Sequence, residues 1–489
     1  MRLVLNHQDK APLYRQVENH LREAILAGRL PAETRLPAIR ALAKELGINR
    51  MTVETAYGNL EAEGLIFTRV GSGTYVLPLP PEPVLSKPSP SEPWPLWQAE
   101  LLTRYPPTVN PTPDRLLSES GSAHPIPFTG IGDPRRFPVK DFARSMQSVL
   151  KRDGVEALGY GETNGFTRLR MTISQVLASQ GLQVPYEQIL ITSGSQQALA
   201  LVTQLLLKTD DVVLVESPTY NSALDLFRML GLKAVGVPVD GLGMQVEQLE
   251  PLLQKFHPKL IYSIPNFQNP SGACMSEIRR RQLVALADRY NVPILEDDFV
   301  GDLRYEGRSQ PTLKALDPGG RVIYTSTFSK MLMPGIRIGF VAAEGPLYDS
   351  LSDLKRLSEL ATSNLVQRCL EDYISIGSYQ AYLRRSCQVY RKRRDLMVQA
   401  IRRYLPKETS FHIPGGGLFI WLRLPDNLSA DALLPAACRN GVNYMPGSVF
   451  YNEPEEGKSY LRLNFVTNPL EDIEEGIKRL GKVLINRGK

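Results

Sequence analysis

A run of prolines divides this chain of 489 residues into two parts. Twelve of the 36 residues between positions 78 and 113 are proline. Proline lacks a backbone N–H and has a fixed φ, so a segment this rich in it favours neither regular helix nor sheet. We interpret residues 78–117 as a linker, and residues 1–77 and 118–489 as separate domains.

The linker sequence predicts an extended spacer. Proline-rich chain favours the polyproline conformation at about 3.1 Å per residue, so it spans at most roughly 110 Å. Trp94, Leu96 and Trp97 interrupt the prolines. These three residues either dock on a neighbouring domain or form a short amphipathic turn.

Composition is typical of a folded protein, with 43% hydrophobic and 22% charged residues. The opening residues, MRLVLNHQDK, lack the apolar core of a signal peptide, and no window reaches the apolar length of a membrane helix. The cysteines form no CxxC pair, so neither a zinc site nor a disulfide framework is indicated. They are Cys274, Cys369, Cys387 and Cys438. We expect a cytoplasmic protein without a metal.

The first domain carries the pattern of a winged helix-turn-helix. Apolar residues recur every fourth position in a first helix that ends near Gly28, and a second helix stops at Gly47. Asn49 is the expected N-cap of a third helix that closes at Gly64. The run LIFTRVGSGTYV then predicts a β-hairpin.

Several side chains of this domain are suited to DNA. Arg50 and Thr52 lie at the start of the third helix, where a recognition helix contacts base edges, and Arg35 and Arg40 flank the second helix. Residues 1–77 hold ten Lys and Arg against eight Asp and Glu, a net charge of only +2. Taken singly, each arginine is better explained as a solvated surface charge than as a DNA contact, so the interpretation depends on the ordered pattern.

That ordered pattern, from PLYRQVENHL to GSGTYV, resembles the GntR-type winged helix almost end to end. The resemblance implies that double-stranded operator DNA is a partner. The residues implied in DNA binding are Arg35, Arg40, Arg50, Thr52 and, in the wing, Gly71 and Gly73. The segment LPAIR lacks the usual serine pair, and Met51 stands where a small polar residue is frequent, which leaves the operator preference open.

Beyond the linker, short β-rich runs such as DVVLVESPTY and VPILEDD alternate with amphipathic helices. This alternation predicts an α/β domain with a mainly parallel sheet, whose ligand sites gather at the carboxyl ends of the strands.

Lys330, in TSTFSKMLMPGIR, is either a surface cation or an amine that forms a Schiff base with an aldehyde. Pyridoxal 5'-phosphate needs partners for its phosphate, ring nitrogen, phenolic oxygen and ring faces. A glycine turn at the start of a helix, with hydroxyl and guanidinium donors near Lys330, is suited to the phosphate. These residues are Gly194, Ser195, Gln196, Thr327, Ser329 and Arg337.

Three further residues are suited to the ring itself. Tyr220 can stack on it, Asp297 can pair with the ring nitrogen, and Asn269 can donate to the phenolic oxygen. Each residue alone is weak evidence for a cofactor site, whereas all of them in this order along one chain are strong evidence.

From Phe128 onward, this constellation resembles the fold-type I aminotransferases. The resemblance implies that Lys330 carries the Schiff base, that Arg462 holds the carboxylate of a ligand, and that Tyr160 reaches the phosphate of the partner subunit in a homodimer. Relatives usually carry a tyrosine two or three residues after the aspartate, but Phe299 and Val300 stand here. Efficient turnover is therefore in doubt, although cofactor binding is not.

The two resemblances on one chain are together similar to the MocR family of transcription regulators. They imply a DNA-binding regulator that senses an amino-group effector or pyridoxal phosphate itself. A working aminotransferase with an appended DNA-binding domain is the alternative, and a domain that only dimerises without the cofactor is a third. The identity of the effector, the operator, and whether the protein activates or represses stay open.

Overall fold

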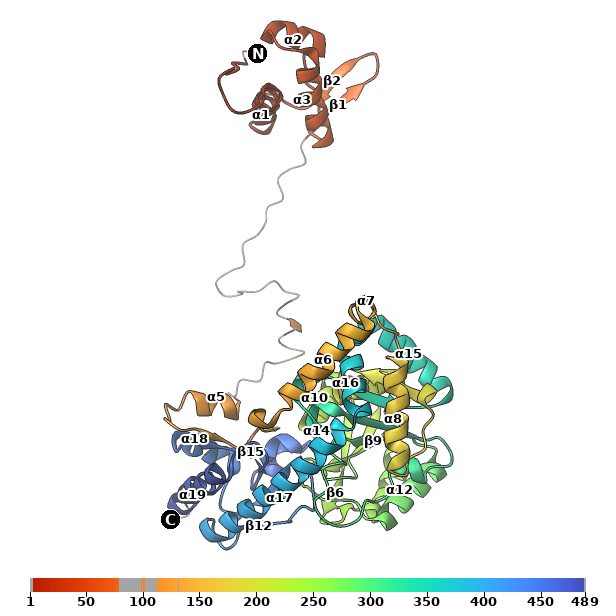
Figure 1. Ribbon diagram of the computed structural model, residues 1–489. Helices are drawn as coiled ribbons and strands as arrows, with labels where there is room; N and C mark the ends of the chain where they lie inside the picture. Colours follow the sequence, from red (N-terminus) through yellow and green to blue (C-terminus); the bar gives the residue numbers. More distant parts are fainter. Residues whose placement is uncertain (1–2, 79–97, 99, 102–111, 131, 488–489) are drawn as a thin grey trace. The chain divides into compact units, whose positions relative to one another are not determined.

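The computed structural model describes residues 3–78, 98, 100–101, 112–130 and 132–487. The chain forms two compact units, which divide between Pro106 and Pro107 (Figure 1). This division falls inside the predicted linker, whose residues 79–97, 99 and 102–111 lie outside the described residues, Trp94, Leu96 and Trp97 among them. Among the described helices, none combines the length and apolar character that crossing a membrane requires.

The N-terminal unit is built on three helices, α1 (Leu13–Leu26), α2 (Ile39–Leu46) and α3 (Arg50–Ala62). Their apolar residues recur three or four positions apart, so one face of each helix is buried in a common core. Gly47 ends α2 in the left-handed conformation, and the Asn49 side chain caps α3 by accepting a backbone N–H of its first turn. The predicted helix-turn-helix is confirmed.

The hairpin follows directly after α3. Strand β1 (Ile66–Arg69) pairs antiparallel with β2 (Gly73–Val76), and Gly71 turns the chain with a φ of +79°. The hairpin lies beside α3 in Figure 1, which completes the predicted winged helix.

The C-terminal unit is organised around an eight-stranded sheet with the strand order β4-β11-β10-β9-β8-β5-β6-β7. All neighbouring pairs are parallel except those made by β7 and β11, so the predicted mainly parallel sheet is confirmed. The strands are β4 (Ile189–Thr192), β5 (Val212–Ser217), β6 (Lys233–Asp240), β7 (Gly243–Met244), β8 (Leu260–Ser263), β9 (Ile294–Asp298), β10 (Val322–Thr327) and β11 (Gly339–Ala342).

Every residue of the central strands β8, β9 and β10 is buried, because helices cover both faces of the sheet (Figure 1). These helices bring apolar residues onto the strands from both sides. They are α6 (Val139–Asp153), α7 (Val155–Leu158), α8 (Thr167–Ser179), α9 (Ser195–Leu206), α10 (Asn221–Met229), α11 (Leu249–Phe256), α12 (Glu277–Tyr290), α13 (Leu313–Leu316), α14 (Phe328–Met331), α15 (Gly345–Glu359) and α16 (Asn364–Ser375).

A smaller antiparallel sheet with the order β12-β13-β16-β15 lies toward the C-terminus. Its strands are β12 (Ser410–Phe411), β13 (Phe419–Arg423), β15 (Met445–Pro446) and β16 (Tyr460–Asn464). Strand β3 (Ile126–Pro127) pairs separately with β14 (Val442–Asn443). The accompanying helices are α5 (Pro113–Ser118), α17 (Ser378–Tyr404), α18 (Ala430–Arg439) and α19 (Leu470–Arg487).

Helix α5 begins within the predicted linker and packs against α18. Pro113 occupies the first turn, where its missing N–H has no helical partner to lose, and the Thr112 hydroxyl accepts the Arg115 N–H. Proline here starts a helix, so residues 113–117 belong with the C-terminal unit.

Candidate cofactor and DNA sites

Lys330 lies at the carboxyl end of the central strand β10, which runs directly into the short helix α14. In the neighbouring strand β9, Asp297 is the last residue but one and is in register with Thr325 of β10, so strand pairing brings lysine and aspartate to the same edge of the sheet. Burial, together with the positive charges of Arg337 and Arg462, lowers the pKa of Lys330 to about 8, against the opposing charge of Asp297. Near neutral pH, the neutral nucleophilic form of this amine is therefore a minority, but a far larger one than in an ordinary lysine.

Asp297 is buried and only half satisfied by the protein. Its Oδ2 accepts a hydrogen bond of 2.9 Å from Tyr262 Oη, whereas its buried Oδ1 has no partner. Burial raises the pKa of Asp297 to about 7, with a contribution from the charge of Asp298. An unpartnered carboxylate oxygen at this depth fits a protonated ring nitrogen.

A turn before α9 forms a cradle for an anion. Gly194 caps α9 with a φ of +95°, and a Cβ on it would lie 2.7 Å from Arg337 Nη2. The Arg337 guanidinium donates to the Ser193 carbonyl at 2.9 Å and to Ser329 Oγ at 3.2 Å. Ser195 and Gln196 occupy the first turn of α9, where free N–H groups attract an anion. Five of the six predicted phosphate residues thus gather here.

The sixth, Thr327, has a different role in the structure. Its hydroxyl donates to the Ile338 carbonyl at 3.1 Å and accepts the Ser329 N–H at 3.1 Å. The single hydroxyl hydrogen is engaged by a backbone carbonyl, so Thr327 caps α14 and positions Ser329 and Lys330. In this geometry, the Thr327 hydroxyl has no hydrogen left to donate to the phosphate, contrary to the expectation.

Arg462, whose charge also acts on Lys330, is joined to Asn269. Arg462 Nη1 donates to Asn269 Oδ1 at 2.8 Å, which leaves the Asn269 amide hydrogens for another acceptor. The guanidinium lies 4.0 Å from the centre of the Phe419 ring, and Arg462 as a whole is 5% exposed and forms no ion pair with a described carboxylate. A buried cation without an anionic partner is suited to a carboxylate ligand.

Tyr220 also belongs to this group. It is half-buried at the end of β5, and burial raises the pKa of its phenol, with a further effect from the charge of Asp297. The positive charges of Arg462 and Arg337 act on this pKa in the opposite direction, so both arginines lie within electrostatic reach of the phenol. Phe299 and Val300, by contrast, are buried in the apolar core and offer no hydroxyl to the site.

Tyr160 lies in the segment between α7 and α8 and is 92% exposed on the single chain. In the prediction, Tyr160 of one subunit reaches the phosphate site around Arg337 in the other subunit. The exposed side chains beside it, Val155 and Leu158, are apolar.

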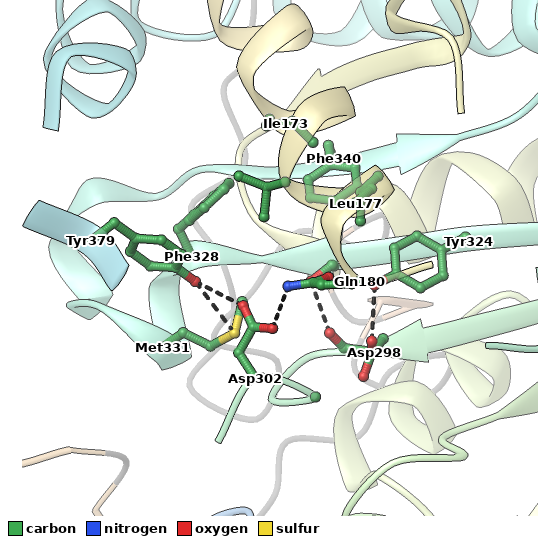
Figure 2. Close-up of a pocket in the computed structure, with 13 residues that line it drawn as sticks. Ile173, Leu177, Gln180, Asp298, Asp302, Tyr324, Phe328, Met331, Phe340 and Tyr379 are labelled. Carbon is green, nitrogen blue, oxygen red and sulfur yellow. Dashed lines mark hydrogen bonds between the residues drawn. The ribbon is translucent and has the colours of Figure 1, made fainter. Parts of the chain in front are cut away.

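A small cavity lies behind α14, lined by α8, α17 and the end of β9 (Figure 2). Asp302 accepts hydrogen bonds from Gln180 at 2.6 Å and from Tyr379 at 3.3 Å, and Asp298 accepts one from Tyr324 at 2.9 Å. These polar groups satisfy one another, and Phe328 and Met331 of α14 form part of the cavity wall. Among the described residues, no group of histidine, cysteine and acidic side chains is placed to hold a metal ion.

In the N-terminal unit, the predicted DNA-contacting arginines are exposed. Arg40 lies in the first turn of α2, and Arg50 begins α3, where it forms an ion pair of 3.7 Å with Glu54. Thr52 is half-buried in the same turn. Arg35 lies against Gly73 of the hairpin, where an added Cβ would approach its Nε to 2.9 Å, so Arg35 joins the wing to the helices.

Sequence reasoning missed several contributors. Tyr262 is a tyrosine inside a buried strand, which is indistinguishable from a core residue until its hydroxyl is seen on Asp297. Ser193 contributes through its backbone carbonyl, which carries no sequence signal. Arg69 stacks on Phe67 and Tyr75 of the hairpin and adds an exposed cation to the wing. Its place as a basic residue inside the predicted hairpin was the sequence signal that could have identified it.

The basic run 384–394, RRSCQVYRKRR, is exposed to solvent only in part. Arg384, Arg385 and Arg391 of α17 are exposed, whereas Arg393 and Arg394 are buried. Arg393 pairs with Asp133 at 2.7 Å and Arg394 with Glu306 at 2.8 Å, so these two cations fasten α17 to its neighbours.

Comparison with known families matches both units. Residues 129–480 match the aminotransferase class I and II family, and residues 13–76 match the gntR family of bacterial regulatory proteins.

Relatives with both parts cover nearly the whole chain. An uncharacterised HTH-type transcriptional regulator of Escherichia coli is 35% identical over 97% of this chain and 99% of its own length. The probable rhizopine catabolism regulatory protein MocR of Rhizobium meliloti is 33% identical over 93% of this chain and 91% of its own.

A further relative covers a smaller share of the chain. An aromatic-amino-acid aminotransferase of Thermococcus litoralis is 37% identical over 73% of this chain and 86% of its own.

Solved structures resemble the C-terminal unit. The kynurenine aminotransferase of Pyrococcus horikoshii, solved with PMP, has a TM-score of 0.75 and 34% identity over 80% of this chain and 100% of its own. The α-aminoadipate aminotransferase of Thermus thermophilus, complexed with N-(5'-phosphopyridoxyl)-L-leucine, has a TM-score of 0.72 and 32% identity over 80% of this chain and 98% of its own.

Proposed function

Because this chain belongs to the MocR family, in which a GntR-type winged helix is joined to an aminotransferase class I and II domain, we propose that it is an effector-responsive transcription regulator. Its C-terminal unit binds pyridoxal phosphate through Lys330 and senses an amino-group ligand or the cofactor itself. The observation that carries this proposal is the meeting of Lys330, the unpartnered Asp297 Oδ1 and the Arg337 cradle at one sheet edge.

The residues divide the cofactor among them. Gly194, Ser195, Gln196, Ser329 and Arg337 hold the phosphate, Asp297 pairs with the ring nitrogen, and Tyr220 covers a ring face. When bound, pyridoxal phosphate supplies an aldehyde and an electron-withdrawing ring. Lys330 supplies the amine, which its lowered pKa leaves partly neutral.

Arg462 and Asn269 define the effector side of the site. A carboxylate that binds Arg462 replaces part of the hydration lost on burial, and it can shift the Arg462 to Asn269 hydrogen bond. We therefore expect an effector with an amino group for the cofactor and a carboxylate for Arg462. With Phe299 and Val300 in place of a tyrosine, Asn269 alone donates to the phenolic oxygen.

Regulation requires a link between this site and DNA. The proposal takes the protein as a cytoplasmic homodimer in which Tyr160 of each subunit completes the phosphate site of the other and two winged helices bind paired half-sites. The effector changes DNA affinity only if it binds the two conformations of the dimer unequally.

The test compares wild type with Lys330→Ala. An operator is first selected in vitro with the full-length protein, and its binding is then titrated with and without pyridoxal phosphate and a panel of amino acids. We expect the cofactor absorbance band and the ligand-dependent change in DNA affinity in wild type only. An equal ligand response in Lys330→Ala would contradict the proposal.

A catalytic aminotransferase is the second candidate, favoured by the complete set of Lys330, Asp297 and Arg462 and by aminotransferase relatives above 30% identity. Keto-acid formation from a panel of amino donors separates the two. Rapid multiple turnovers through both half-reactions would support the enzyme, whereas a single slow half-reaction would support the regulator.

A further inference from the structure

Two charged side chains of α15, Lys355 and Glu359, lie next to the phosphate turn but do not line it. They are one helical turn apart, on the part of α15 that packs against α9. Neither residue was part of the predicted site, and neither is in the set that holds the cofactor.

Glu359 holds the turn from behind. Its carboxylate accepts a hydrogen bond of 2.5 Å from Ser193 Oγ and another from Gln197 Nε2. Gln197 in turn accepts the Ser193 N–H at 2.7 Å. The backbone of Ser193 is thereby fixed with its carbonyl toward Arg337, which donates to it at 2.9 Å. The orientation of Arg337 therefore depends on Glu359.

Lys355 is fully buried, with none of its surface exposed. Its Nζ donates to the Thr163 carbonyl at 2.7 Å, in the segment that follows Tyr160. Burial alone would raise the pKa of the Glu359 carboxyl, but hydrogen bonds from Ser193 and Gln197 and the charge of Lys355 hold it below its usual value. Glu359 is therefore ionised near neutral pH.

An ionised carboxylate behind a phosphate site presents an electrostatic conflict. Phosphate carries close to two negative charges at pH 7, and like charges in a partly buried setting repel each other by an amount that affects affinity. The hydrogen bonds from Glu359 help to form the cradle, whereas its charge opposes the ligand. Lys355, one turn earlier on the same helix, carries a positive charge that acts on Glu359, although its Nζ is bonded to the Thr163 carbonyl and forms no ion pair within 4.0 Å of the Glu359 carboxylate.

We propose that Lys355 is a positioning residue that neutralises Glu359, so that Glu359 can order the phosphate turn without repelling the phosphate of the cofactor. The inference rests on the proposed binding of pyridoxal phosphate at this turn. It assigns to α15 a role in cofactor affinity, and it gives a reason for burying a lysine that contacts no ligand.

The experiment uses four full-length proteins stripped of cofactor: wild type, Lys355→Met, Glu359→Gln and the double variant. Pyridoxal phosphate affinity is measured by absorbance titration, and pyridoxal, which lacks the phosphate, is titrated in parallel. Lys355→Met and the double variant both lose the hydrogen bond to the Thr163 carbonyl, so they differ only at residue 359, where glutamine removes the charge and the acceptor for Gln197 Nε2.

We expect Lys355→Met to weaken pyridoxal phosphate binding by roughly tenfold, the size of an effect of about 1.4 kcal/mol. The double variant should return to within about threefold of wild type, because a glutamine keeps an acceptor for Ser193 without the charge. Glu359→Gln alone, which loses the hydrogen bond from Gln197 together with the charge, is the reference for the double variant, and the affinity for pyridoxal should change little throughout.

A double variant as weak as Lys355→Met, or an equal loss of pyridoxal affinity, would show a merely structural role and overturn the inference. If wild type itself binds no pyridoxal phosphate, the proposed function fails and this inference with it. Should Lys355→Met fail to fold, Lys355→Gln keeps a donor for the Thr163 carbonyl and takes its place in the same comparison.

Discussion

Lys330 acquires its chemical character from its neighbours. Burial and the charges of Arg337 and Arg462 disfavour its protonated form, and Asp297 only partly opposes them. The neutral amine is the form that attacks an aldehyde, so its pKa sets the pH at which the cofactor can be captured.

We predict that the rate at which cofactor-free protein captures pyridoxal rises with pH around a midpoint of about 8, against 10.5 for an ordinary lysine. The folded-state pKa is lowered, so the neutral fraction grows at a lower pH. Arg462→Gln removes one positive charge and should move the midpoint upward. Stopped-flow absorbance gives the rates, and a wild-type midpoint near 10.5 would argue against this environment.

At this scale, sequence reasoning succeeds where the chemistry depends on a side chain in a loop or at a strand end. Asp297 lies near the end of β9, Lys330 lies just after β10, and Arg337 lies in the segment before β11. Arg462 lies in the middle of β16, and only the family resemblance pointed to it. Sequence reasoning fails for Tyr262, whose buried strand position resembles that of any core residue, and for Thr327, whose hydroxyl the backbone engages.

At the scale of elements, the turn from β4 into α9 depends on the absence of a side chain at Gly194. Both its positive φ and the closeness of Arg337 exclude a Cβ. Gly335, in the loop after α14, meets nothing within 4 Å of an added Cβ.

Gly194→Ala should therefore weaken pyridoxal phosphate binding by at least tenfold, through displacement of Arg337, whereas Gly335→Ala should leave it within about twofold. Equilibrium dialysis of both variants provides the measurement. Equal affinities in the two variants would show that the turn is not the phosphate cradle.

The recognition helix α3 permits a second prediction among the elements. Arg50→Gln should weaken DNA binding and, if Arg50 contacts a phosphate, lower the slope of log affinity against log salt by about one. Arg29→Gln, which removes an exposed arginine after α1, is the matched control. Salt titrations by fluorescence anisotropy test this, and identical slopes in both variants would exclude Arg50 from the interface.

Elements of this chain were predictable where periodicity and caps agree. The ends of α1, α2 and α3 follow from their apolar spacing and from Gly47 and Asn49. The start of α5 was missed because the high proline content argued against any helix in this segment. A proline in the first turn, such as Pro113, instead favours the start of a helix. The burial of Arg393 and Arg394 depends on acids far away in sequence, which no local pattern reveals.

At the scale of the whole molecule, one polypeptide joins a winged helix to a cofactor-binding unit. The exposed Tyr160, with the apolar Val155 and Leu158 beside it, is the surface through which we expect a second copy to complete each site.

Mixing two inactive variants tests this arrangement. Each heterodimer of Lys330→Ala with Tyr160→Ala has one site with both defects and one site with neither. We expect the mixture, after subunit exchange, to regain cofactor affinity that neither variant has alone. Sites formed within one subunit would give no recovery, since every site would keep a defect.

The central claim is that Lys330 carries pyridoxal phosphate, and borohydride reduction of the full-length protein followed by peptide mapping tests it most directly. We expect a phosphopyridoxyl group on the peptide that contains Lys330, and its loss when a competing amine is added before reduction. A reduced protein with no label, or with the label on another lysine, would contradict this claim.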